Sequence, residues 1–277
     1  MNSTLLNKIL VTLVVFTPVF NEAKAGQAIL VDTTRQLAAN SETAPIRRTV
    51  MVSNINYPTI LDYHKEKTLE YVKKFSETRR ENIINLYEKG KKYFPSIEKV
   101  FQQYDIPQEL KVLIAIESGF NANAISPAGA VGYWQFMTAA ARHYGLKTGS
   151  SAKYKYIDDR RNFSRSTVAA AKYLKDSYVL FNDILLTVSS YNCGVGGVKS
   201  AIRRSGKKDA DFWDVKHLLP AETRKYVMNF IAMIVIFENY EKFKTSQLVF
   251  TPVPQEIQLG NVPLYNTLKS ISSNHVE

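Results

Sequence analysis

Glu117 is the side chain of this sequence best placed for acid–base chemistry, because it follows an apolar stretch at helical spacing. Leu110, Leu113 and Ile114 precede it by seven, four and three residues, so on a helix Glu117 shares their inward face. Burial disfavours the charged form of a carboxyl group and raises its pKa, which keeps a proton available near neutral pH. By itself the spacing favours a structural glutamate paired with an arginine or with backbone amides, and the surrounding sequence shifts the balance toward chemistry.

The segment after Glu117 carries polar and turn-forming residues. Asn121, Asn123 and Ser126 lie in it, and Gly129 and Gly132 permit tight turns. A polar surface can therefore fold back over the end of the helix. Loops on a rigid scaffold often carry function.

An aromatic group closes this segment. Tyr133, Trp134 and Phe136 surround Gln135, and they could offer apolar faces and an amide to sugar rings. Such aromatics more often belong to a core than to a cleft, so this group alone does not decide the function.

Two further segments place polar and aromatic residues at the ends of apolar helices. They are "SSYNCG", from Ser189 to Gly194, and "ETRKYV", from Glu222 to Val227. No Ser-His-Asp or Cys-His arrangement competes with Glu117. Cys193 has no suitably placed histidine to activate its thiol, so we interpret it as an inert small residue.

Composition limits the possible partners. The 277 residues, 45% of them hydrophobic, can bury a core. The formal charge of +11 favours an anionic partner without choosing among nucleic acid, a lipid surface and an acidic polymer. A single cysteine excludes an intramolecular disulfide, and the four histidines lack the close pair spacing of metal sites. We therefore expect neither a metal nor a cofactor.

The first 25 residues are typical of an export signal. Lys8 precedes the apolar run "ILVTLVVFTPVF", and a polar stretch then ends in "AKA" at Ala25. The run contains Pro18 and is short for a membrane span, so we predict cleavage that leaves Gly26 as the first residue. The mature chain is then expected in the periplasm or cell envelope. Export argues against nucleic acid as partner and favours a wall polymer.

The chain is predicted to be mainly α-helical. Residues 26–62 show no sustained period and are interpreted as a linker or loosely packed arm. Residues 63–100 carry apolar side chains three to four positions apart, which predicts a helical extension of two amphipathic helices. Residues 101–244 predict the main helical domain, and the proline-containing residues 245–277 predict an extended tail.

Several helices are expected within residues 101–244. Asp105 and Gln108 match an N-cap and its capping-box partner, and Gly119 is a natural stop. The last expected helix contains an apolar run from Val227 to Phe237 that is too short to span a membrane, so we expect it in the core. The other segments with helical period are "YWQFMTAAARHYG", "STVAAAKYLKDSYVLF", "DILLTVSSYN" and "VGGVKSAIRR".

Four ordered motifs resemble the characteristic segments of the soluble-lytic-transglycosylase-like family. They are "ES" at Glu117 and Ser118, "SPAGAVGYWQFM" from Ser126 to Met137, "SYNCG" ending at Gly194, and "ETRKYV". The tryptophan in "GYWQFM" and the segment upstream of Glu117 are most similar to the membrane-bound lytic murein transglycosylase D branch. The resemblance covers roughly Glu70 to Phe243.

This resemblance implies a lysozyme-like helical domain that cleaves the MurNAc–GlcNAc β-1,4 bond of peptidoglycan without water and leaves 1,6-anhydroMurNAc ends. It makes Glu117 the single catalytic acid and base, and it implies peptidoglycan glycan strands as the partner. The substrate-binding residues that it implies are Ser126 and Gln135 at sugar amide and hydroxyl groups, Met137 in the floor of the cleft, and Tyr191, Asn192 and Tyr226, which would line the cleft and hold the glutamate.

Some expectations stay open at this point. Members of the branch often carry a lipid-attachment cysteine or wall-binding LysM modules, and the sequence shows neither, which leaves anchoring and processivity open. Protein partners are unknown. Peripheral association with the cell envelope is compatible with the sequence. Cys193 stands where Ala or Ser is common. Two alternative functions are a goose-type lysozyme activity with water as nucleophile, and a wall-binding protein that holds glycan without cutting it.

Overall fold

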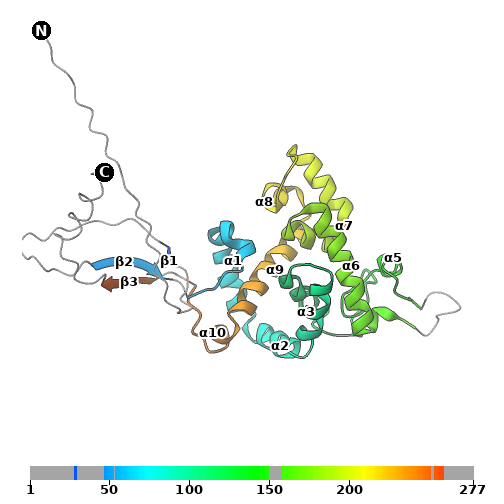
Figure 1. Ribbon diagram of the computed structural model, residues 1–277, viewed down its shortest axis with the longest axis horizontal. Coiled ribbons are helices and arrows are strands. Elements are labelled where there is room, and N and C mark those ends of the chain that lie inside the picture. The colour runs from blue at the N-terminus through cyan, green and yellow to red at the C-terminus, as the bar shows by residue number, and fades with distance from the viewer. Residues whose placement is uncertain (1–27, 30–46, 53, 150–156, 251–252, 259–277) are drawn as a thin grey trace, which may run out of the picture.

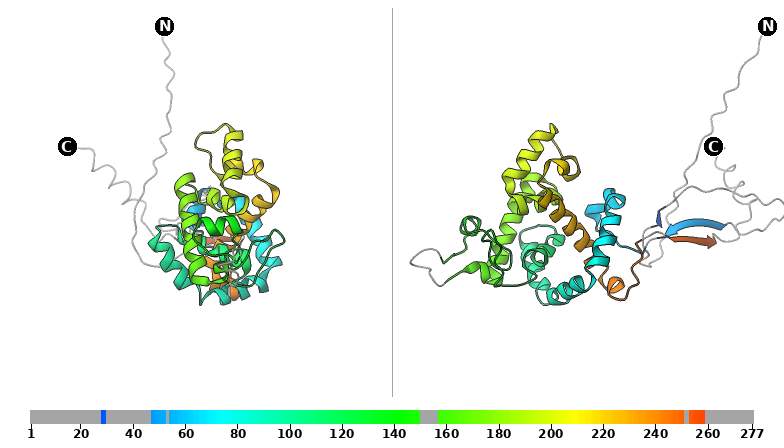
Figure 2. Two further views of the ribbon diagram at one scale, coloured as in Figure 1. Left: turned by 90° about the vertical axis from the view of Figure 1, so that its right-hand side faces the viewer. Right: turned by 180° about the vertical axis from the view of Figure 1, so that it is seen from behind.

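The structure, a computed structural model, describes residues 28–29, 47–52, 54–149, 157–250 and 253–258. The described residues form a body of α-helices and a small three-stranded sheet beside it (Figure 1 and Figure 2). The mainly α fold class predicted from the sequence is confirmed. The predicted export signal lies outside the described residues.

The helices follow one another along the chain without interruption by strands. The α-helices are α1 (Lys65–Thr78), α2 (Arg80–Gly90), α3 (Phe94–Gln103), α4 (Leu113–Ser118), α5 (Thr138–His143), α6 (Phe163–Phe181), α7 (Ile184–Ser205), α8 (Phe212–Val215), α9 (Ala221–Glu238) and α10 (Tyr240–Lys244). The 3-10 helices are η1 (Thr59–His64), η2 (Gln108–Val112), η4 (Asp159–Arg161) and η5 (Lys216–Leu218).

Helix α9 is the centre of the helical body (Figure 1). Every residue from Val227 to Phe237 except Asn229 is buried, and the helix packs against α1, α4 and α7. A helix that is apolar on all sides has to be enclosed by other elements. The prediction of a buried core helix is therefore confirmed. No helix of the described residues combines the length and the apolar character needed to cross a membrane.

Helices α6 and α7 pack against each other, and α7 packs against α9. The chain reverses at Asn182, whose φ of 47° is left-handed, and Asp183 caps α7 by accepting a hydrogen bond of 2.6 Å from the Leu186 amide. The sequence predicted two separate helices here. Both are present within α7, because Gly194 has a non-helical φ of 77° and ψ of 155° and separates two helical segments.

The helical extension contains three helices, where the sequence predicted two. The chain breaks at Arg79, whose φ of −131° and ψ of 17° are not helical. It breaks again before α3, which has Pro95 in its first turn. A proline is tolerated there but not in a helix interior. Val72, Ile83 and Ile97, one from each of the three helices, are buried in the common core.

The expected helix start at Asp105 is wrong. Asp105 has a φ of 48° and ends α3 instead of starting the next helix. Its amide donates to the Gln102 carbonyl at 3.1 Å, and the Ile106 amide donates to the Phe101 carbonyl at 3.2 Å. These two hydrogen bonds form a Schellman motif at the end of the helix. Pro107 disfavours a helical Ile106, so η2 begins only at Gln108.

The sheet joins the two ends of the described chain. Its order is β1 (Ala28–Ile29), β2 (Arg47–Val52), β3 (Val253–Gln258), and both pairings are antiparallel. The sequence showed no strand pattern within residues 26–62, and β2 differs from that expectation. A six-residue strand whose partner strand lies more than 200 residues later in the chain leaves little local signal. The extended tail expected at residues 245–277 stays a prediction, and residues 253–258 of it form β3.

Asparagine side chains connect this sheet to the helical body. Asn239 accepts from the Asn56 amide at 2.8 Å and donates to the Asn56 carbonyl at 2.7 Å. Asn54 accepts from the Val249 amide at 2.8 Å. The segments that lead out of β2 and into β3 are thus tied to each other and to the end of α9.

Gly90 provides a test of the packing under the end of α2. A Cβ atom on Gly90 would lie 2.3 Å from Cζ of Phe94 and 2.8 Å from Cζ of Phe120. The Phe94 ring is enclosed edge-on by Tyr87, Phe120 and Phe237, so it has little room to move. We expect Gly90→Ala to lower the free energy of unfolding by about 1–3 kcal/mol in urea titrations.

Gly196→Ala is the matched control. Gly196 also lies in a helix, and an added Cβ would meet nothing within 4 Å. Alanine there should raise the free energy of unfolding by about 0.5–1 kcal/mol. Equal effects at the two positions would contradict the packing described for Gly90.

Candidate active site

Glu117 lies in the last turn of α4, where the chain leaves the core. Leu110, Leu113 and Ile114 are fully buried, and Glu117 is partly buried on the same side, as the spacing predicted. Gly119 ends the helix with a left-handed φ of 55°, and its amide donates to the Ala115 carbonyl at 3.1 Å. The helix therefore stops directly after the carboxyl group.

Burial raises the pKa of Glu117 from 4.5 to about 7. The Tyr226 hydroxyl from α9 donates a hydrogen bond to Oε1 of Glu117, which opposes the effect of burial because it stabilises the carboxylate. The pKa of Tyr226 is raised well above 10, by burial first and by Glu117 second, so the phenol keeps its proton. The carboxyl group is thus poised to give and to take a proton near neutral pH.

Tyr191 and Asn192 come from α7, just before its kink. The Tyr191 hydroxyl donates to the Trp134 carbonyl at 2.8 Å, and Oδ1 of Asn192 accepts from the Thr223 hydroxyl at 2.7 Å. Burial and the nearby Glu117 charge both raise the pKa of Tyr191. Of the three residues expected to hold the glutamate, Tyr226 bonds it directly, and these two fasten the elements around it.

Residues 120–137, which we name the site loop, fold back over the end of α4. The Ser118 hydroxyl donates to the Tyr133 carbonyl at 2.7 Å and accepts from the Asn121 amide at 3.2 Å. Inside the loop, Oγ of Ser126 accepts from the Ala130 amide at 3.0 Å. The predicted polar loop next to the glutamate is therefore present.

Gln135 crosses the site loop from one side to the other. Its φ of 48° is left-handed, and its Nε2 donates to the carbonyls of Ala124 at 3.2 Å and Gly132 at 2.9 Å. No described residue donates to its amide oxygen. Gln135 is partly buried, and Met137, next to it, is 47% exposed. Both remain open to a ligand.

The aromatic residues of the loop belong mainly to the core. Trp134 is fully buried and donates from Nε1 to the Thr167 hydroxyl at 3.0 Å, and Phe136 is 4% exposed. Tyr133 packs against Tyr93 and Phe163. Trp134 and Phe136 thus lie in the core, the more common of the two alternatives that the sequence left open. The helix expected from Tyr133 begins only at Thr138, because the chain turns at Gln135.

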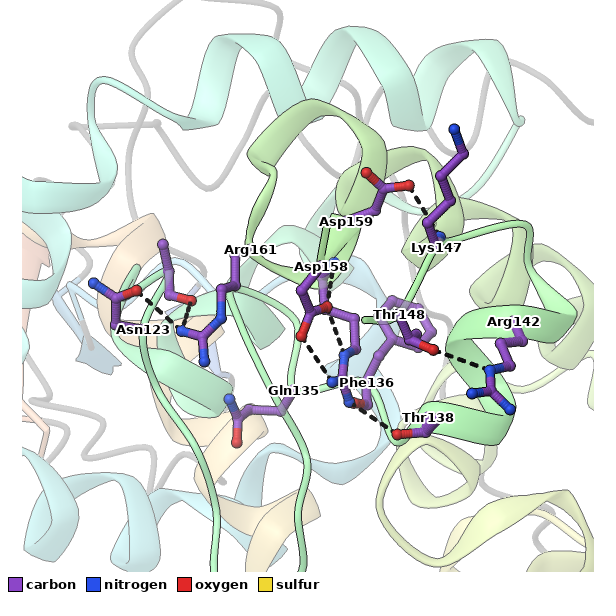
Figure 3. A network of polar contacts seen from close by, with 12 residues as sticks. Asn123, Gln135, Phe136, Thr138, Arg142, Lys147, Thr148, Asp158, Asp159 and Arg161 are labelled. Carbon is purple, nitrogen blue, oxygen red and sulfur yellow. Dashed lines mark hydrogen bonds and ion pairs between the residues drawn. The ribbon is translucent and has the colours of Figure 1, made fainter. Parts of the chain in front are cut away.

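An arginine pair behind the loop is the part of the site that sequence reasoning missed (Figure 3). Arg160, 8% exposed, donates to Asp158 through Nε and Nη2, each at 2.8 Å. Its Nη1 donates to the Phe136 carbonyl and the Thr138 hydroxyl, both at 3.2 Å. Burial raises the pKa of Asp158, but the bonds and charge of Arg160 outweigh burial and keep it below its ordinary value. The only signal was "DDRR" between apolar helices.

Two other expectations concern metals and Cys193. No three His, Cys, Asp or Glu side chains of the described residues gather as metal ligands would. Burial raises the pKa of the Cys193 thiol above its ordinary value, with a smaller opposite effect from Thr223. A raised pKa disfavours the reactive thiolate, which favours the interpretation of an inert residue.

The fold and the site together define a class: a helical domain built around one partly buried carboxyl group that titrates near neutral pH. Residues 95–213 match the family model described as the transglycosylase SLT domain. The resemblance seen in the motifs is therefore confirmed for these residues, which match the SLT domain model. The matched range includes Glu117, the site loop and Tyr191, and it ends before Tyr226.

Curated relatives agree with this family. "Membrane-bound lytic murein transglycosylase D" of Escherichia coli (strain K12) is 37% identical over 142 residues, which are 50% of this chain and 30% of that protein. "Membrane-bound lytic murein transglycosylase C" of Haemophilus influenzae (strain PittGG) is 28% identical over 143 residues, 48% of this chain and 40% of that protein. The chain thus spans 30% to 40% of the length of these relatives.

A solved structure, the 70 kDa soluble lytic transglycosylase of Escherichia coli, is similar with a TM-score of 0.42 and 24% identity. The similarity covers 55% of this chain and 25% of that one.

The raised pKa of Glu117 predicts a pH dependence of stability. The unfolded chain titrates near 4.5 and the folded chain near 7, so between these values the folded protein binds more protons. Its stability therefore falls as pH rises through this window. Glu117→Gln removes the titration. The free energy of unfolding of the variant minus that of the parent should rise by about 2–3 kcal/mol between pH 5 and pH 8, and parallel curves would contradict the shift.

Tyr226→Phe should raise the pKa of Glu117 further, because it removes the donor that stabilises the carboxylate. The measurement is a carbon-13 NMR titration of the Glu117 carboxyl carbon. Tyr71→Phe is the control, because the Tyr71 hydroxyl also donates to a residue of α9, Oδ1 of Asn229, at 2.7 Å. This variant should leave the titration of Glu117 unchanged. An unshifted or lowered pKa in Tyr226→Phe would refute the assigned donor.

Proposed function

We propose that this chain is a peptidoglycan lytic transglycosylase, which cleaves the MurNAc–GlcNAc β-1,4 bond and forms 1,6-anhydroMurNAc ends. The proposal rests on one observation above all. Within the family domain Glu117 has a pKa raised to about 7, and its hydrogen-bond partner is the phenol of Tyr226. The curated relatives carry the names of murein transglycosylases, and the proposal extends that activity to this chain.

The first step uses Glu117 as an acid. With a pKa of about 7 a large fraction of the carboxyl groups are protonated near neutral pH, and the proton passes to the oxygen of the scissile bond as the bond breaks. The sugar becomes oxocarbenium-like, and the substrate's own N-acetyl group stabilises it. The Tyr226 hydroxyl then stabilises the carboxylate that remains.

The second step uses the same residue as a base. The carboxylate takes the proton of the 6-hydroxyl of the muramic sugar, whose oxygen attacks C1 and closes the anhydro ring. Most glycosidases instead use two carboxyl groups about 5–9.5 Å apart. A second carboxylate so near would raise the pKa of Glu117 further, and among the described residues only burial and Tyr226 shift it. This supports a mechanism with one carboxyl group.

Substrate binding is assigned to residues around Glu117. The free amide oxygen of Gln135 suits sugar hydroxyl or N-acetyl groups, and Met137 offers an exposed apolar surface. Ser126 lies in the same loop. Tyr191 and Asn192 border the site from α7. We also propose export to the periplasm or envelope by the N-terminal signal, in keeping with the wall polymer as substrate.

Product analysis tests the proposed function. Purified peptidoglycan digested by the protein should release muropeptides one water lighter than lysozyme products, without a reducing muramic end, as seen by mass spectrometry. Glu117→Gln should lower the rate by at least about 1,000- to 10,000-fold, because one residue serves as acid and base. Glu222→Gln, an exposed glutamate at the start of α9, is the control and should remain active.

Other outcomes identify the alternatives. Hydrated muropeptides alone would mean a hydrolase of the lysozyme kind. Binding of peptidoglycan without any release would mean a wall-binding protein.

A further inference from the structure

The turn η4 contacts the site loop from behind, and the proposed mechanism gives it no role. Arg161, the residue after Arg160, donates from Nη1 to the Ala122 carbonyl at 3.2 Å and to Oδ1 of Asn123 at 3.0 Å (Figure 3). Arg160 meanwhile bonds the Phe136 carbonyl. Two successive arginines therefore hold the beginning and the end of the same loop.

Gly132, near the middle of the loop, also meets this turn. A Cβ atom on Gly132 would lie 1.9 Å from the carbonyl oxygen of Arg160, so the two backbones touch. The φ of Gly132 is 84°, which a glycine adopts without cost. The turn η4 thus supports the loop at three separate points.

The contact made by Arg161 continues toward Gln135. The Ala124 carbonyl, two residues after Ala122, accepts from the Gly132 amide at 2.9 Å and from Nε2 of Gln135 at 3.2 Å. Residues 122–124 therefore lie between the guanidinium of Arg161 and the amide of Gln135. If Arg161 no longer holds them, the amide loses a fixed acceptor.

We propose that Arg161 is a positioning residue for glycan binding, which acts on Gln135 through residues 122–124. The inference rests on the proposed function, because Gln135 is taken to bind the sugar. A prearranged side chain binds a ligand more tightly than one that has to be ordered first. Arg161 therefore contributes to affinity without contacting the glycan.

Binding and chemistry should separate in this arrangement. Glu117 is carried by α4 and bonded by Tyr226 of α9, and neither element contains a partner of Arg161. Loss of Arg161 should change KM much more than kcat. A merely stabilising arginine would change the melting temperature and leave both constants alone at permissive temperature.

The experiment compares Arg161→Met with the parent on soluble glycan strands of alternating GlcNAc and MurNAc. We expect KM to rise about 10-fold, with kcat within about 3-fold of the parent. The Kd for the same strands, measured in a Glu117→Gln background to prevent cleavage, should rise equally. Arg161→Lys, which keeps the charge and one donor, should recover part of the affinity.

Arg165→Met is the matched control. Arg165 is a nearby arginine whose Nη1 bonds Asp159 at 2.6 Å and whose side chain is 59% exposed. It makes no hydrogen bond to the site loop. Its replacement should leave KM and Kd unchanged. Equal binding by Arg161→Met and Arg165→Met, or a fall in kcat at constant KM, would overturn the inference.

Amide hydrogen exchange without substrate keeps the two proposals distinguishable. The Gly132 amide bonds the Ala124 carbonyl directly, so its exchange should accelerate by roughly 10-fold in Arg161→Met and not in Arg165→Met. Unchanged exchange would sink the positioning role even in an active enzyme. If the parent protein binds no glycan although exchange responds, the proposed function has failed and the role in glycan binding fails with it.

Discussion

The burial of one carboxyl group at the end of α4 is the constraint on which the rest of the site depends. Burial keeps the proton on Glu117 near neutral pH, and one polar partner has to stabilise the carboxylate once the proton has left. Tyr226 is that partner, and it comes from α9, more than one hundred residues later in the chain. The core helix α9 therefore also lowers the proton affinity of the site, against the larger effect of burial.

The second constraint is a polar loop that has to lie over this carboxyl group without a regular structure of its own. The backbone is left-handed at Phe120, Gln135 and Gly132. This conformation is unfavourable for Phe120 and Gln135, so it needs support from outside the loop. The support comes from the arginines of η4, which bond backbone carbonyls, and from Tyr191, which bonds the Trp134 carbonyl. The shape of the loop is imposed largely by other elements.

The sequence was sufficient wherever apolar periodicity carried the information. It predicted the mainly α fold, the core helix α9 and the inward face shared by Glu117 with Leu110 and Leu113, and these agree with the structure. It failed at Asp105, where the chemistry of an N-cap also suits the left-handed end of α3. Aspartate is favoured both at an N-cap and at a left-handed helix end, so its presence alone cannot distinguish the two.

Other features escaped because their cause is distant. Strand β2 has a partner near the opposite end of the chain, and Arg160 and Arg161 act on carbonyls 24 and 39 residues away. The sequence allowed Trp134 to lie either in the core or in the cleft. The structure places it in the core, where its indole N–H donates to the Thr167 hydroxyl. The family resemblance implied that Tyr191, Asn192 and Tyr226 hold the glutamate, and the structure identifies Tyr226 as the one that bonds it.

The order of pairing between β2 and β3 has a mechanical consequence. Arg47 pairs with Gln258 at the outer end of the ladder, and Val52 pairs with Val253 at the end nearest the helices. Tension applied to Arg47 and Gln258 would break the pairs of this ladder one after another from the outer end, instead of shearing all of them together. A load on Arg47 and Gln258 would therefore separate β2 from β3 at low force before it reached the helices, and the geometry around Glu117 would be spared.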